Sequence, residues 1–280
     1  MHVNAINPLP QDFRLTPSIV KDGNLTPKIE HFGNVKITSH REPGHTTLAA
    51  GDFPPTSKVV IETGSENDEI RIRMGAGDQV LAEINGVTVP LDLDGDWRKG
   101  LIVIKTGPGN DKITVENDVS TSIEIDTGEG DDTVKTGGGD AYVKLGEGDD
   151  SGALGVGGGA LYGEGGNDVL QGGSDGDSHI SGGAGNNTIR SGTAGQTWVV
   201  AEGNRDDINV LAPTGIITNA RSTHMRIEKN AEADIKIDQT AGNTETFILG
   251  ASQAGDGDEN VTFFSGRNEP DKDKRYYIPS

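Results

Sequence analysis

The chain has 280 residues and a formal net charge of −20, from 24 basic and 44 acidic residues, which argues against nucleic-acid backbones and anionic membranes as partners and favours cations. Hydrophobic residues make up 32% and aromatic residues 4% of the chain, too few for a thick globular core, whereas the 42 glycines are typical of a fold rich in tight turns. Cysteine is absent, which excludes disulfides, thiolate metal sites and cysteine nucleophiles.

The N-terminal residues 1–34 are polar and contain Pro8, Pro10, Pro17 and Pro27, which predicts a flexible arm. The first 25 residues have no basic segment followed by an apolar run, so we expect no Sec signal peptide. No stretch approaches the roughly 18 consecutive apolar residues of a membrane span, so none is expected. If the protein is exported, we expect a route that does not use a cleaved apolar signal.

Residues 35–100 contain short strand patterns such as VKIT, KVVIE and EIRIR, in which β-branched and polar residues alternate. Asn85-Gly86 lies between two of these patterns and predicts a type I′ hairpin. We therefore expect an irregular or antiparallel β cap in this region. TGSENDEIR (63–71) already resembles a degenerate form of a repeat that follows, with Asp68 at its sixth place.

Residues 127–180 divide into six consecutive nine-residue units: TGEGDDTVK, TGGGDAYVK, LGEGDDSGA, LGVGGGALY, GEGGNDVLQ and GGSDGDSHI. The units share Gly at the second and fourth places, an acidic or small residue at the sixth and usually an apolar residue at the eighth. Self-similarity at a short fixed period predicts a solenoid. An earlier unit has Asp111 at its sixth place, and the step from Asp111 to Asp132 exceeds two units by three residues, which predicts a small bulge in 116–122.

These units resemble the calcium-binding nonapeptide GGxGxDxUx of the RTX (repeats-in-toxin) family, with the closest match at GEGGNDVLQGG (163–173). The resemblance covers roughly residues 100–210, and most units lack the first Gly. It implies a parallel β-roll in which two units form one turn. We expect an all-β fold, a β-roll or right-handed β-helix solenoid of short stacked strands over 101–264, with calcium-binding repeats at 106–190 and a tail at 265–280.

Because two units form one turn, alternate units stack on the same edge. Asp132, Asp150 and Asp168 recur at intervals of two units on one edge, followed by Asn187. Rungs of a parallel stack lie about 4.8 Å apart, so unneutralised carboxylates would repel through every layer. Calcium accepts six to eight oxygens, from carboxylates and backbone carbonyls, and suits such a site better than magnesium.

We therefore predict Ca²⁺ between turns on this edge, and little or none on the other edge, whose sixth places are Ala141, Gly159 and Asp177. The candidate ligands are Asp111, Gly128, Gly130, Asp132, Gly146, Gly148, Asp150, Gly163, Gly165, Asp168 and Asp177. The fifth-place residues Asp131, Asp149 and Asn167 are expected to face solvent. A metal-free solenoid, in which Asp side chains cap turn amides, is the alternative.

No catalytic motif is present: the sequence has no HExxH, GxSxG, P-loop or dinucleotide fingerprint. His179 is expected to be a strand residue rather than a base, and Trp198 to be packed rather than to stack sugars. Asp92, Asp94 and Asp96 in PLDLDGDW are interpreted as a polar turn. We therefore expect no catalysis by this chain itself.

The resemblance implies a secreted bacterial protein that folds with calcium and acts extracellularly or inside a host cell, as a virulence effector or an interaction module. Its expected partners are calcium ions and a host protein or surface glycan, and the chain is expected to be a monomer. Two alternatives stay open. One is a β-helical carbohydrate-active enzyme, a polysaccharide lyase or hydrolase, and the other is a structural adhesin.

Overall fold

The computed structural model describes residues 27–42, 45–47, 51–53, 56–93, 98 and 100–211, together with five strands between 214 and 264. Side chains are described for 27–41, 57–93, 98 and 100–211. The predicted tail at 265–280, most of the predicted arm at 1–34, and Asp94, Asp96 and Trp97 lie outside the described residues.

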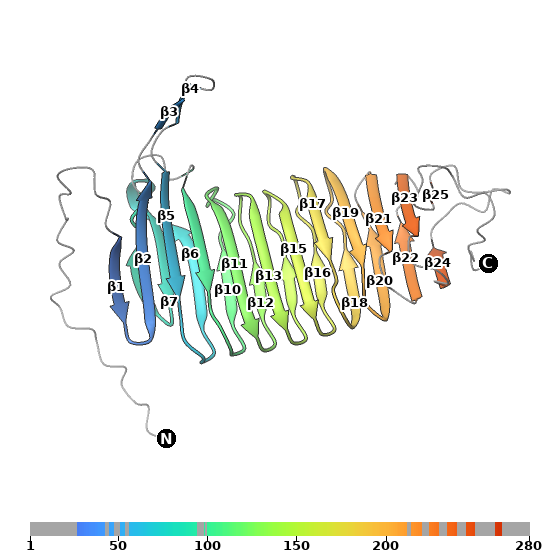
Figure 1. The fold of residues 1–280 in the computed structure, drawn as a ribbon, viewed down its shortest axis with the longest axis horizontal. Coiled ribbons are helices and arrows are strands. Elements are labelled where there is room, and N and C mark those ends of the chain that lie inside the picture. Colours follow the sequence, from blue (N-terminus) through green and yellow to red (C-terminus); the bar gives the residue numbers. More distant parts are fainter. Residues whose placement is uncertain are drawn as a thin grey trace.

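The protein is a β-solenoid made of two long sheets, between which the chain alternates turn after turn (Figure 1). The 12-stranded sheet contains, in spatial order, β1 (Lys28–Phe32), β2 (Val35–Glu42), β5 (Thr56–Glu62), β9 (Leu101–Lys105), β11 (Ser122–Glu129), β13 (Ala141–Glu147), β15 (Gly159–Gly165), β17 (Ser178–Ser181), β19 (Gln196–Ala201), β21 (Thr214–Asn219), β23 (Asp234–Gln239) and β25 (Val261–Phe264). The 11-stranded sheet contains β24 (Glu245–Leu249), β22 (His224–Lys229), β20 (Arg205–Val210), β18 (Asn186–Arg190), β16 (Val169–Gln171), β14 (Ser151–Ala153), β12 (Thr133–Lys135), β10 (Lys112–Val115), β6 (Glu69–Met74), β7 (Val80–Ile84) and β8 (Val87–Pro90). The predicted all-β solenoid of parallel stacked strands is confirmed, and the described residues include no α-helix, only the 3-10 turn η1 (Ala76–Asp78).

The N-terminal end of the solenoid is antiparallel, as expected. In one sheet β1, β2 and β5 pair antiparallel, and in the other β6, β7 and β8 do so. Asn85 and Gly86 form the turn between β7 and β8 with φ of 50° and 80°, the left-handed conformation that a type I′ turn requires. β5 and β6 then pair parallel with β9 and β10 and so begin the solenoid, while β3 (His45–Thr47) and β4 (Gly51–Phe53) form a separate hairpin.

The strand register confirms that two nine-residue units make one turn. Thr133 pairs with Ser151 and Ser151 with Val169, in each case at a separation of two units. The step from Lys112 to its partner Thr133 is longer than two units by three residues, and so is the step from Leu101 to Ser122. The additional residues lie between Thr114 and Ile123, where the bulge was predicted.

Several later turns are longer than two nine-residue units, beginning with the turn that contains Asp177. Gly159 pairs with Ser178 rather than with Asp177, because one residue is inserted in 172–177. Asp177 therefore does not occupy the sixth place that the repeat count assigned to it. The same shift makes Ile180 the inward residue of β17 and turns His179 outward, as a strand residue.

The core is a single column of aliphatic side chains between the two sheets. Most strands contribute only one to three of them, and those that are 0% exposed include Val143 and Leu145 in β13, Leu161 in β15 and Leu170 in β16. The core has no room for a side chain at Gly152, because a Cβ there would lie 2.8 Å from a methyl carbon of Leu161 and 2.9 Å from one of Leu145. The core is thin and continuous, so each turn depends on its two neighbours.

Truncating this column should destabilise the protein far more than truncating an outer residue. We expect Leu161→Ala to lower the free energy of unfolding by about 2–5 kcal/mol, through lost burial and the cavity left behind. Val169→Ala is a matched control, because Val169 is 54% exposed on β16. Its effect should stay within about 0.5 kcal/mol in urea denaturation. Equal effects of the two substitutions would contradict the register described here.

Candidate functional site

A column of acidic side chains runs along the inside of one solenoid edge. Its members occupy equivalent positions in successive turns, at or just before the strands of the 11-stranded sheet, and each is at most 2% exposed. The column, which we term the aspartate ladder, consists of Asp68, Asp111, Asp132, Asp150, Asp168, Asn187 and Asp206. The strand alternation explains its direction: the residue after each ladder member faces outward and the next one enters the core.

One carboxylate oxygen of the ladder residues is bound by the main chain. The Oδ1 atoms of Asp111, Asp132 and Asp150 each accept a hydrogen bond of 2.7 Å from the backbone N–H of the ladder residue one turn earlier. Asp168 and Asn187 accept equivalent bonds of 3.0 Å. The ladder therefore links each turn to the next through side chain and backbone.

The other oxygen is left unsatisfied along most of the ladder. The Oδ2 atoms of Asp68, Asp111, Asp132, Asp150 and Asp168 are buried and accept no hydrogen bond. The hydroxyls of Thr106 and Thr127 lie near Asp111 and Asp132, but each donates to the carbonyl of the next turn. At the corresponding places beside Asp150 and Asp168 the chain has Leu145 and Gly163, which offer no hydroxyl.

Burial is the main reason that these carboxyl groups resist ionisation. It raises the pKa of Asp150 to about 7, against the hydrogen bond from the Asp132 amide and with a contribution from the neighbouring Asp132 and Asp168 charges. Burial likewise raises the pKa of Asp168 to about 6. The pKa values of Asp111 and Asp132 are also raised by burial, opposed by their threonine and amide contacts. A column of buried carboxyls thus has no counter-charge from the described part of the chain at its centre.

A second ladder lies on the solvent side of the same edge and runs in the opposite direction. Here the backbone N–H of the later turn donates to the earlier side chain: Asp149 N to Asp131 Oδ1 at 3.0 Å and Asn167 N to Asp149 Oδ1 at 2.7 Å. These three side chains are exposed, as predicted. The outer ladder fastens the turns without burying charge.

The glycines between the two ladders let the turns stack closely. Gly128, Gly130, Gly146 and Gly148 have φ between 104° and 139°, and a Cβ on any of them would overlap a carbonyl of the preceding turn. In the next turn, however, Gly146 pairs with Glu164, which has a φ of 70°. The place equivalent to Gly148 is taken by Gly166, which has a φ of 132°.

Gly163 and Gly165 therefore lie one residue before the places equivalent to Gly146 and Gly148. Gly163 has another role, because a side chain there would collide with Asp168 Oδ2 and with the Gly182 carbonyl. Gly165 pairs with Glu147 in the neighbouring strand. Asp177 lies apart from the ladder: it is exposed on the opposite edge and accepts a hydrogen bond of 2.8 Å from Gln196 N.

The ladder contains members that the repeat count did not include among the candidate ligands. Asp68 begins it, in the unit interpreted as degenerate, and Asp206 follows Asn187 one turn later. Each lies one turn away from a ladder residue that the repeat count identified, and two residues before an isoleucine of a strand. The sequence therefore contained the signal for both.

The described part of the chain contains no group of three or more His, Asp or Glu side chains placed to hold a metal ion. A cation between two turns of the ladder would therefore have two carboxylates at most and would need backbone carbonyls as well. This donor set suits calcium, which accepts carboxylate and carbonyl oxygens together in a flexible geometry. The buried Oδ2 atoms without a donor are consistent with that requirement.

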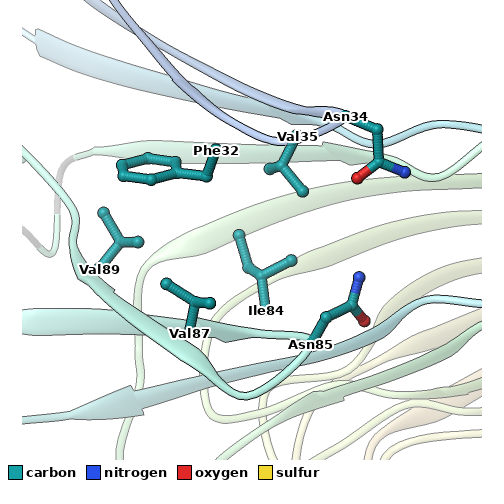
Figure 2. A pocket seen from close by; sticks show the side chains of 7 residues that line it. All are labelled: Phe32, Asn34, Val35, Ile84, Asn85, Val87 and Val89. Atoms are coloured by element: carbon teal, nitrogen blue, oxygen red, sulfur yellow. The ribbon is translucent and has the colours of Figure 1, made fainter. Parts of the chain in front are cut away.

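A small pocket of about 90 Å³ lies at the N-terminal end, where its lining residue Asn85 donates a hydrogen bond of 2.6 Å from Nδ2 to Oδ1 of Asp68, the first ladder residue (Figure 2). It is lined by Phe32, Asn34, Val35, Ile84, Asn85, Val87 and Val89. None of these side chains is an acid, a base or a nucleophile, so the pocket brings no catalytic groups together.

The fold and the site define a parallel β-solenoid with a buried aspartate ladder. Comparisons of the chain with protein-family models, with curated proteins and with solved structures find no match. Among the described residues, no helix is both long and apolar enough to cross a membrane.

Proposed function

We propose that this protein is a calcium-binding β-solenoid that acts by binding a partner rather than by catalysis. The observation that carries the proposal is the pair of Oδ2 atoms of Asp150 and Asp168, which are buried in successive turns without a hydrogen-bond donor. A buried carboxylate is costly unless it is paired, neutralised or bound to a metal. A divalent cation between turns would remove this cost at two carboxyls at once.

The proposed ligands are the Oδ2 atoms of Asp132, Asp150 and Asp168, with carbonyls of the intervening turns completing each site. When bound, calcium supplies charge neutralisation and a link between successive turns. The chain itself supplies the rest: the Oδ1–amide bonds hold each carboxyl in place, and Gly163 leaves room beside Asp168.

Calcium binding would be coupled to folding. Most strands place only one to three aliphatic side chains in the core, and the net charge is −20, so the metal-free chain is only marginally stabilised. Low cytosolic calcium would leave the repeats loose enough for export, and higher calcium outside the cell would complete them. We infer from this a secreted protein that serves as an effector or interaction module.

A metal-free scaffold is the competing function, and the unbroken series of side-chain–amide hydrogen bonds from Asp68 to Asn187 favours it. In that case the ladder carboxyls would serve only to accept the amide hydrogen bonds that cap the turns.

Isothermal titration calorimetry with calcium and magnesium distinguishes the two functions. We expect a calcium-specific heat for the wild-type protein, and its loss in an Asp150→Asn/Asp168→Asn double variant. Asp149→Asn is the matched control, because Asp149 precedes Asp150 in the same turn but is exposed. It should retain the binding heat. No calcium-specific heat would leave the metal-free scaffold as the function, and equal calcium heats for all three proteins would place the ion away from Asp150 and Asp168.

A further inference from the structure

Four ring-bearing side chains gather on the outer face of the 12-stranded sheet. Tyr142, Tyr162, His179 and Trp198 come from β13, β15, β17 and β19, four neighbouring strands in consecutive turns (Figure 1). Tyr142 and His179 are each in register with Ala160, and His179 is in register with Trp198. We term this row the aromatic strip.

Three rings of the strip contact one another in succession, and Trp198 stands in register with the last of them. The ring centroids of Tyr142 and Tyr162 are 5.3 Å apart with an interplanar angle of 49°, and those of Tyr162 and His179 are 5.9 Å apart at 48°. Tyr142 is 43% exposed, and the other three side chains are partly exposed, including Trp198, which the sequence had indicated would be packed. Solvent therefore reaches rings in all four turns.

The strip is not needed to fill the core. The buried core of the described residues is built from aliphatic side chains and contains no Tyr or Trp. The whole chain has only 4 Tyr and 2 Trp, so the placing of three of them together on one outer face is a strong concentration. Exposed aromatic residues on a rigid sheet are typical of binding surfaces, because they offer large contact area at little cost in conformational entropy.

The polar residues around the strip restrict the charge of its partner. Glu124 stands beside Tyr142 in the adjacent strand, and Asp126 is exposed in the same strand. Lys144 is in register with Tyr162, but its Nζ is paired with Glu164 Oε1 at 3.6 Å. The surface therefore offers hydrogen-bond acceptors and repels anions.

We propose that the aromatic strip binds an uncharged, extended glycan chain that lies along the solenoid axis. Pyranose rings present apolar C–H faces that stack on aromatic rings, while their hydroxyls donate to flanking carboxylates. Successive strands lie about 4.8 Å apart, close to the advance of one pyranose residue in an extended chain. The tilt between neighbouring rings suits a chain that turns at each glycosidic bond.

This proposal goes beyond the calcium function and does not depend on it, because the strip lies outside the sheet and the ladder lies inside the edge. Both conditions, excess calcium and excess chelator, belong in the binding assay, with circular dichroism to confirm the fold in each. If chelator abolishes both glycan binding and the strand signal, the loss is explained by calcium-dependent folding. If glycan binding is absent while the fold is intact, the proposal for the strip itself fails.

The test titrates the full chain with soluble β-1,4-linked glucose and N-acetylglucosamine oligomers. Calorimetry measures affinity, and Trp198 fluorescence reports contact in a Trp97→Phe background, where Trp198 is the remaining Trp. We expect binding by the wild-type protein with a blue shift of Trp198 emission. Tyr162→Ala and Trp198→Ala should each weaken binding at least tenfold by calorimetry.

Val169→Ala is the control, since it removes exposed apolar surface from the opposite sheet and should leave the affinity unchanged. Polygalacturonate is the charged comparison and should not bind. The proposal is overturned if folded wild-type protein binds neither oligomer, if polygalacturonate binds in preference to them, or if the strip variants bind like the control.

Discussion

In excess chelator, the protein should become less stable as the pH rises from about 4 to about 7. The ladder residues Asp150 and Asp168 have native pKa values raised by burial to about 7 and about 6, against 3.8 for the ordinary side chain. Between the ordinary and the native pKa the native state holds protons that the unfolded state has lost. Since stability falls with pH wherever the native state binds more protons, the unfolding free energy must decrease through this window.

The effect should be among the largest that solution conditions exert on this chain. At about 1.4 kcal/mol per pKa unit, the shift of Asp150 alone corresponds to roughly 4 kcal/mol between pH 4 and pH 8. Calcium should oppose the trend, because it competes with protons for the same oxygens and binds better as the carboxyls ionise. At a hundred times its dissociation constant, calcium adds about 2.7 kcal/mol per site.

Urea denaturation followed by circular dichroism, at several pH values in chelator and in calcium, measures both trends. We expect the stabilisation by calcium to be small near pH 4 and largest near pH 8. A stability that rises with pH in chelator would contradict the buried, uncompensated ladder. A stabilisation by calcium that does not depend on pH would place the ion away from these carboxyls.

Asp150→Asn should stabilise the metal-free protein at pH 8, an unusual result for a substitution at a buried polar residue. The asparagine keeps the oxygen that accepts the Asp132 N–H and removes the buried charge. Asn187 shows that the ladder accepts this side chain: its Oδ1 accepts from Asp168 N at 3.0 Å, and its Nδ2 donates to Asp206 Oδ1 at 3.0 Å. The gain should be nearly lost near pH 4, where Asp150 is protonated in the native state and partly protonated in the unfolded state.

Asp150→Ala separates the charge from the hydrogen bond. It also removes the charge, but it leaves the buried amide of Asp132 without an acceptor, which costs about 1–3 kcal/mol. We therefore expect the alanine variant to be less stable than the asparagine variant by this amount at every pH. Chemical denaturation in chelator at pH 4 and pH 8 measures both differences. Equal stabilities of the two variants would mean that the Oδ1–amide bond contributes nothing.

The two-unit turn, the edge on which the aspartates stack and the antiparallel N-terminal end were all predictable from local patterns. The Gly positions and the alternating apolar residues define the turn length. Asn85-Gly86 defines the hairpin between β7 and β8. Both features depend on the conformations of a few neighbouring residues. The predicted bulge before Ile123 follows from counting alone.

What counting did not predict was a one-residue insertion, which moved Ser178 into the place given to Asp177. An insertion in a turn leaves the strand pattern intact, so only the pairing of Gly159 with Ser178 reveals it. Counting also did not place Glu164, which pairs with Gly146 and adopts the left-handed conformation that glycine holds in the turns before it.

The sequence by itself determined that this chain stacks as a solenoid and that carboxyl groups recur on one edge, since both follow from a period. The tertiary structure decided what these carboxyls experience. Packing between turns buries Asp150 and Asp168. A backbone amide donates to Oδ1 of each, and Oδ2 of each has no hydrogen-bond donor. Their environment and the meeting of Tyr142, Tyr162 and His179 depend on contacts between residues of different turns, which no local pattern records.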